Sequence, residues 1–257
     1  MRIDKASTSK IVFIAMIVLG LILFIKSKFQ TSHVAGPLPV EEAQVATAVK
    51  YTEVNVNKSN DYGTVKGVYP TFENIGNMLN ISISAFVDVI SKEHLGIAEE
   101  NWNARINTGG SNELPDETEK FPLEISYDIA QANSEFVSVL VRYGGYQGGA
   151  HGYQNTVSFN YDVVNQKIMS LGDLFPDDED YLETLSAFSK TNLTDLFTSK
   201  EGTQLDEFFL DMIDAGTAPT SENYQVFTFT NDALTIYFGE YQVAPYVYGP
   251  QKVEFPL

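Results

Sequence analysis

The stretch FPLEISYDIAQANSEFVSVLVRYGGY, residues 121–146, contains the clearest secondary-structure pattern in the chain. Apolar and polar residues alternate in its first half, and its second half is rich in β-branched and aromatic residues, which is typical of β-strands. Asn133 and Ser134 lie between the two halves and favour a turn. Residues 121–146 are therefore predicted to form a β-hairpin.

Strand-like and helix-like segments surround this hairpin. Further strands are predicted at 49–57, 62–70 (ending at Pro70), 155–171 with a turn at 164–167, 224–230, 233–239 and 252–256. A helix is predicted at 74–95, because apolar residues recur there in steps of three and four. Pro176 and the acidic residues 177–180 favour a helix start, and helices are predicted to follow at about 179–197 and 203–215. Helices that separate runs of antiparallel strands predict an α+β fold, a mostly antiparallel sheet with helices packed on one face.

The segment at 11–25 contains no charged residue and is bounded by Lys10 and Lys26. As a helix it would be about 22 Å long. That is shorter than the hydrocarbon core of a bilayer, about 30 Å, but flanking lysines can extend the span. We expect a single transmembrane helix that anchors the chain. The alternatives are a cleaved signal peptide and a buried core helix.

Orientation and domain organisation follow from this anchor. Arg2, Lys5 and Lys10 favour a cytoplasmic location for residues 1–10. Residues 26–48 are then a linker, followed by an extracytoplasmic α+β domain at 49–257. Within this domain, 49–145 is expected to form an N-terminal subregion and 146–257 a C-terminal subregion.

The composition excludes several classes of function. The 257-residue chain has no cysteine, so disulfides, thiolate nucleophiles and iron–sulfur clusters are excluded. Residues 29–257 contain 11 Lys and Arg against 33 Asp and Glu, a net charge of −22. A surface this acidic disfavours nucleic acid and attracts cationic partners, although solubility alone would also explain it.

No recognised catalytic or cofactor-binding motif is present. There is no Gly-x-Ser-x-Gly elbow, phosphate-binding loop or dinucleotide fingerprint, so no cofactor is predicted. His33, His94 and His151 are expected in a linker, at a helix end and in a loop, so no metal site is predicted either. Two carboxylates at a suitable separation would suffice for a glycosidase, but Asp173 and Glu240 are expected to have structural roles.

The glycine-rich stretch YGGYQGGAHGY, residues 143–153, is the main candidate for a binding loop. Glycines permit positive φ and expose backbone N–H groups, and tyrosines offer flat contact surfaces. A second aromatic segment, YFGEYQVAPYVYGP, lies at 237–250. The candidate binding residues are Tyr146, Gly148, Gly149, His151, Gly152, Tyr153, Tyr241, Tyr246 and Tyr248.

Three sequence blocks together resemble a bacterial envelope-domain family. They are GVYPTFENIGN at 67–77, GGAHG at 148–152 followed by DVVNQKIMSLGDLF at 162–175, and LTIYFGEYQVAPYVYGPQKVEFPL at 234–257. The family occurs in the extracytoplasmic part of the lysozyme-sensing anti-sigma factor RsiV and in the N-terminal region of the peptidoglycan deacetylase PdaC. The resemblance implies an α+β fold and, by analogy with the sensor, a cationic protein partner.

The chain departs from both of these proteins. A cytoplasmic tail of about ten residues is too short to hold a sigma factor, and the clustered metal ligands of a deacetylase are missing. We therefore expect a membrane-anchored, non-catalytic domain that binds a protein such as a lysozyme, or a cell-wall glycan. The alternative is a carboxylate-dependent hydrolase that acts on glycan or peptidoglycan.

Overall fold

The computed structural model describes residues 46–110 and 113–257. Residues Ala46–Leu257 form one compact unit. The predicted tail at 1–10, the predicted anchor at 11–25 and nearly all of the predicted linker lie outside the described residues. Within the described ranges, no helix has both the length and the apolar character needed to cross a bilayer.

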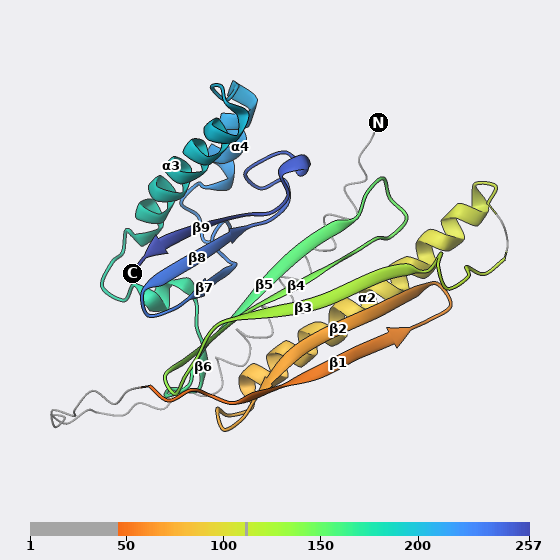
Figure 1. Cartoon of the computed structure of the whole chain (residues 1–257), viewed down its shortest axis with the longest axis horizontal. Coiled ribbons are helices and arrows are strands. Elements are labelled where there is room, and N and C mark those ends of the chain that lie inside the picture. The colour runs from red at the N-terminus through yellow and green to blue at the C-terminus, as the bar shows by residue number, and fades with distance from the viewer. Residues whose placement is uncertain (1–45, 111–112) are drawn as a thin grey trace. The chain divides into compact units, whose positions relative to one another are not determined.

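Six strands form the larger sheet, in the order of the chain (Figure 1). They are β1 (Tyr51–Ser59), β2 (Gly63–Phe72), β3 (Phe121–Ala132), β4 (Phe136–Gly145), β5 (Tyr153–Asp162) and β6 (Lys167–Ile168). Neighbouring strands are antiparallel except β2 and β3, which are parallel. A parallel pair needs a long crossover, and the helix α2 (Met78–Asn107) supplies it.

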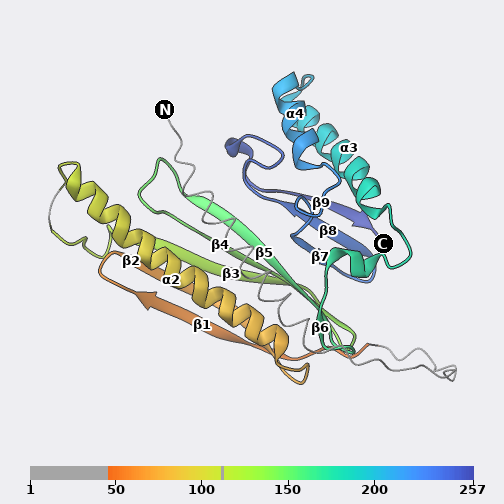
Figure 2. The same cartoon turned by 180° about the vertical axis from the view of Figure 1, so that it is seen from behind.

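The helix α2 covers one face of the larger sheet, as Figure 2 shows. Phe86 of α2 contacts the ring of Phe159 on β5, with the ring centroids 5.8 Å apart. Alternate residues of β3, such as Leu123 and Ile125, are buried on this side, whereas Glu124 between them is exposed. The period-two pattern of these strands therefore directs their apolar side chains against α2.

A second, antiparallel sheet has its own helical layer. It consists of β7 (Phe227–Phe229), β8 (Ala233–Phe238) and β9 (Gln251–Pro256). The helices α3 (Tyr181–Glu201) and α4 (Glu207–Gly216) pack against it (Figure 1). The core between them contains, among others, the fully buried side chains of Leu185, Leu193, Phe197, Ile213 and Phe238.

A buried polar seam joins the two sheets on the face of the larger sheet opposite α2. The Asn160 side-chain amide donates to the carbonyl of Phe227 over 2.8 Å. The Ser138 hydroxyl donates to the Asn160 side-chain oxygen over 2.6 Å and accepts from the backbone N–H of Phe229 over 3.0 Å. The Ser158 hydroxyl accepts from the N–H of Phe227 over 3.0 Å. These side chains satisfy backbone groups of β7 that the sheet-to-sheet contact removes from water.

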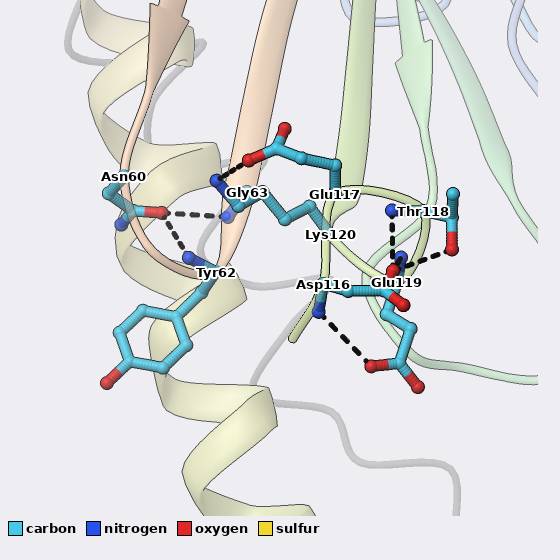
Figure 3. A network of polar contacts seen from close by, with 8 residues as sticks. All are labelled: Asn60, Tyr62, Gly63, Asp116, Glu117, Thr118, Glu119 and Lys120. Atoms are coloured by element: carbon cyan, nitrogen blue, oxygen red, sulfur yellow. Dashed lines mark hydrogen bonds and ion pairs between the residues drawn. The ribbon is translucent and has the colours of Figure 1, made fainter. Parts of the chain in front are cut away.

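Short polar turns fix the end of the larger sheet where β1 and α2 end (Figure 3). The Asn60 side-chain oxygen accepts from the N–H groups of Tyr62 and Gly63, over 2.9 and 2.8 Å, and closes the β1–β2 turn. In the segment that leads into β3, an Asp116 carboxylate oxygen accepts from the N–H and the hydroxyl of Thr118. Hydrogen bonds from the Thr118 hydroxyl and N–H hold the pKa of Asp116 below its ordinary value.

The predicted α+β class and the hairpin at 121–146 are confirmed, with three corrections. The strands form two sheets, each with its own helices, rather than one sheet with helices on one face. The helix predicted at 74–95 is longer and extends to Asn107. The strand predicted to end at Pro70 continues to Phe72, because β3 pairs with β2 only over Gly63–Gly67 and requires no N–H at Pro70.

Candidate functional site

The glycine-rich stretch forms the loop between β4 and β5. Gly145 ends β4 and pairs with Tyr153, the first residue of β5. A Cβ atom added to Gly145 would lie 2.1 Å from the carbonyl oxygen of Pro122, so only glycine permits this approach of β4 to β3. Gly148 adopts a φ of +84°, which also favours glycine. The backbone thus accounts for two of the glycines without any ligand.

One side of the loop is fastened to β3 and α2. The Tyr146 hydroxyl donates to the carbonyl of Gly149 over 2.9 Å, and its ring meets the Phe121 ring edge-on at 5.8 Å. Asn101 of α2 donates to the carbonyl of Gln147 over 2.6 Å. These contacts fix the first half of the loop, which contains the candidates Tyr146, Gly148 and Gly149.

Tyr153 is directed inward, to a buried histidine. His94 lies on the buried face of α2, not at a helix end as expected from the sequence. Its Nε2 atom lies 3.0 Å from the carbonyl oxygen of Phe121, and its Nδ1 atom lies 3.3 Å from both the Tyr153 hydroxyl and the Gln147 side-chain nitrogen. Burial lowers the pKa of His94 and raises that of Tyr153, so both side chains are neutral at pH 7. Neutral His94 donates from Nε2 and accepts at Nδ1.

The other side of the loop carries a stack of three aromatic rings, which we call the ring stack: His151, Tyr246 and Tyr241. The His151 and Tyr246 ring centroids lie 3.9 Å apart with planes inclined by 30°, and the Tyr246 and Tyr241 centroids lie 5.6 Å apart at 28°. The Tyr246 hydroxyl donates to the carbonyl of Gly152 over 3.0 Å. The stack therefore joins the β4–β5 loop to the segment between β8 and β9.

Tyr241 is the exposed end of the ring stack, with 55% of its surface accessible. Its φ is +64°, a conformation that costs a non-glycine residue on the order of 1–3 kcal/mol. The next residue, Gln242, fixes this turn: its side-chain amide donates to the carbonyls of Gly216 and Asn223 over 3.1 Å, and its oxygen accepts from the N–H of Gly239 over 3.0 Å. A strained backbone that holds a large exposed ring is a feature of functional sites.

Tyr248 lies apart from the ring stack. Its ring packs edge-on against Phe197 of α3 and Phe209 of α4, at 5.2 and 5.3 Å. Its hydroxyl donates to the Glu201 carboxylate. Of the nine candidate residues, the structure brings His151, Gly152, Tyr241 and Tyr246 together, whereas Tyr153 and Tyr248 contact other partners.

An open groove of about 650 Å³ adjoins the ring stack. One wall is the face of β3, β4 and β5 opposite α2, and the other is formed by β8, β9 and the segment before β9. Its lining includes Glu124, Arg142, Gln154, Tyr237, Tyr246 and Lys252. Along β4 and β5, the groove residues 142–145 and 152–156 lie between the polar seam and the glycine-rich loop. A volume of this size is typical of small-ligand sites.

The carboxylates near the family motifs have structural partners. Asp173 accepts from the N–H and hydroxyl of Ser170, both over 2.7 Å, and from Lys167 over 2.9 Å, which confirms its expected capping role. Glu240 accepts from the N–H of Gln154 over 3.2 Å and so ties the β8–β9 segment to β5. Burial raises the pKa of Glu240, although this hydrogen bond and His151 act in the opposite direction.

Within 46–110 and 113–257, no three His, Asp or Glu side chains are grouped so that they would hold a metal ion. Sequence reasoning missed the polar groove walls, in particular Arg142, Gln154 and Lys252. The only signal for them was their strand alternation, which marks them as lying opposite the core-facing residues. Nothing in that pattern says that two such faces from different sheets lie opposite each other.

In a comparison with known protein families, the last third of the chain matches one family. Residues 172–257 match a family described as protein of unknown function (DUF3298). This region contains α3, α4, β7–β9 and two of the three rings of the stack. The chain is also 32% identical over 136 residues to the peptidoglycan-N-acetylmuramic acid deacetylase PdaC of Bacillus subtilis. That match spans 53% of this chain and 28% of PdaC, so the chain corresponds to only a part of the relative.

Two crystal structures of DUF3298 family proteins share the fold. One, from Bacteroides fragilis, has a TM-score of 0.53 at 19% identity, over 82% of this chain and 92% of that one. The other, from Pseudomonas aeruginosa PAO1, has a TM-score of 0.53 at 14% identity, over 81% and 90%. The resemblance to an envelope-domain family found in PdaC, inferred from the three sequence blocks, is therefore confirmed.

Proposed function

We propose that residues 46–257 form a non-catalytic binding domain of a membrane-anchored envelope protein, and that its ligand is a cell-wall glycan. The observation that carries the proposal is the ring stack at the mouth of the groove. Its outermost ring, Tyr241, is exposed and held in a strained turn, and flat aromatic surfaces of this kind pack against sugar rings. The similarity to part of PdaC, a protein whose name states that it acts on peptidoglycan, supports the same ligand class.

The groove favours binding over hydrolysis. Glu124 is the one carboxylate among the residues that line it. Glycosidases of the usual kinds place two carboxyl groups about 5–9.5 Å apart across the bond they cleave. A hydrolase at this groove would need a second carboxylate, and Glu240 already accepts a hydrogen bond from the β5 backbone. Release of reducing sugar from peptidoglycan that is abolished by Glu124→Gln would favour the enzyme.

Calorimetric titration with soluble peptidoglycan glycan fragments tests the proposal. Tyr241→Ala is expected to weaken binding about 5- to 10-fold, because a stacking contact contributes about 1 kcal/mol beyond the area that it buries. Tyr246→Phe keeps the ring and loses only the hydrogen bond to Gly152, so it should bind nearly as the parent does. Tyr51→Ala removes an exposed tyrosine of β1 and is the matched control. Equal affinity of the Tyr241→Ala variant and the parent would refute a role for the ring stack.

A cationic protein of the lysozyme type is a second candidate, favoured by the charge. The net charge of −22 over residues 29–257 would draw a basic protein toward the domain. Titration against a basic lysozyme at low and at physiological salt separates two outcomes. One-to-one binding that survives physiological salt supports a specific protein partner. Binding that disappears with salt means that the charge acts only generically.

A further inference from the structure

We infer that the groove beside the ring stack binds a glycan whose sugars carry carboxylate groups, and that Lys252 contacts this carboxylate. The inference rests on the proposed glycan function and specifies the chemistry of the ligand. It starts from the distribution of charge. The chain carries 34 Asp and Glu against 16 Lys and Arg, yet the charged side chains that line the groove are two cations and one anion.

The two cations come from opposite walls. Arg142 projects from β4 of the larger sheet, and its guanidinium forms an ion pair with Asp128 of β3. Lys252 projects from β9 of the smaller sheet and is exposed. Among the described residues Lys252 forms no ion pair, like several other surface lysines, whereas the other groove cation, Arg142, is paired. Lys252 is therefore the groove cation that remains available to a ligand.

The neighbours of Lys252 are aromatic residues that line the same groove. Tyr237 of β8 lies directly opposite Lys252 in the β8–β9 pairing. The Tyr237 hydroxyl is hydrogen-bonded to Thr228 over 3.1 Å, so this ring is held in the groove wall. Tyr246 lines the same groove and belongs to the ring stack. A sugar chain that stacks on the exposed ring of Tyr241 and continues past Tyr246 into the groove would reach Lys252 with a later substituent.

A carboxylate on that sugar supplies the missing partner. An ammonium group and a carboxylate form a charge-assisted hydrogen bond, which is stronger than a neutral one. In a protein of this net charge, the long-range field opposes an anionic ligand, so only direct contact can favour it. Without that contact, an uncharged glycan of the same length should bind better than an acidic one. Tighter binding of the acidic glycan than of the neutral one would therefore indicate contact with Lys252.

The test compares two tetrasaccharides on the full-length chain, kept in mild detergent. One alternates N-acetylglucosamine with its lactyl ether, which carries a carboxylate, and the other is the neutral N-acetylglucosamine tetramer. We expect the parent to bind the acidic tetramer about 5- to 10-fold more tightly than the neutral one. This ratio is below the full strength of a charged hydrogen bond, because Lys252 is exposed to solvent. Lys252→Gln should abolish this preference and leave affinity for the neutral tetramer unchanged. Lys66→Gln, at an exposed lysine of β2, is the matched control.

The outcomes separate the inference from the proposed function. If both tetramers bind the parent equally, with affinity that depends on Tyr241, the glycan function holds and the role of Lys252 is refuted. Retention of the preference in the Lys252→Gln variant also refutes it. If neither tetramer binds, both the glycan function and the inference are wrong. Thermal melting of each variant verifies that the fold is intact, and Arg142→Gln provides a second variant on the opposite wall.

Discussion

The polar seam between the two sheets should contribute measurably to the free energy of unfolding. Asn160 is only 2% exposed, and its side chain makes two hydrogen bonds, to the carbonyl of Phe227 at 2.8 Å and from the hydroxyl of Ser138 at 2.6 Å. Asn160→Ala removes both and leaves the buried Ser138 hydroxyl proton without its acceptor. A hydrogen bond contributes about 0.5–1.5 kcal/mol net, and an unsatisfied buried group costs about 1–3 kcal/mol. We expect the free energy of unfolding to fall by about 2–4 kcal/mol.

Urea unfolding of a fragment spanning residues 36–257, which contains the whole described unit, measures this loss. For a unit of this size, the melting temperature should fall by roughly 4–16 °C. Asn192→Ala is the matched control, because Asn192 is exposed and bonds only to Phe188 within α3, so its effect should stay within about 0.5 kcal/mol.

A double-mutant cycle with Ser138→Ala makes the prediction sharper. The two side chains share one hydrogen bond, so the double variant should lose less than the sum of the single losses, by about 1 kcal/mol. A loss for Asn160→Ala no larger than that of the control would refute the reasoning, and so would strict additivity in the cycle. The first result would mean that Asn160 does not stabilise the contact between the sheets, and the second that its hydrogen bond with Ser138 contributes no coupling energy.

Two further predictions concern the glycine-rich loop and the helix beneath it. Burial holds the pKa of His94 below 6.5, so His94 binds a proton more tightly in the unfolded chain than in the folded one. The free energy of unfolding should therefore fall as the pH drops below about 6.5, by at most about 1.4 kcal/mol per pH unit. Urea unfolding between pH 5 and 8 should show this slope in the parent and not in His94→Gln; parallel profiles would contradict it. Gly145→Ala should destabilise the domain by more than 1 kcal/mol, because its Cβ would lie 2.1 Å from the carbonyl oxygen of Pro122. Gly96→Ala, on an exposed turn of α2 with open space around it, should instead stabilise it by roughly 0.5–1 kcal/mol, and the same sign for both would refute the packing argument.

Local sequence patterns predicted the type of most helices and strands, although not all of their ends. Alternation in 121–146 predicted the hairpin of β3 and β4, and three- and four-residue steps predicted most of α2. Asp173 was expected as a cap and forms the capping box with Ser170. Each of these features depends on residues a few positions apart, so the interacting partners can be recognised within a short stretch of sequence.

The candidate site was only partly accessible to such reasoning. The two aromatic segments, at 143–153 and 237–250, were recognised as candidate binding surfaces, but not their pairing through His151 and Tyr246. Tyr153 and Tyr248 lie in the same two segments as the residues of the ring stack. Tyr153 nevertheless contacts His94, and Tyr248 packs against Phe197 and Phe209. Residue type does not determine on which side of a loop a ring will lie.

The sequence alone therefore determined the elements, the α+β class and the acidic character of the chain. The tertiary structure decided that the strands form two sheets, that Ser138 and Asn160 join them, and that a groove lined by Arg142 and Lys252 lies between them. The physical reason is the range of the interactions. Propensity, capping and alternation act over a few residues, whereas the seam and the groove depend on contacts between β4, β5 and strands some 70–110 residues later. Only the packing of two complete sheets brings those residues together.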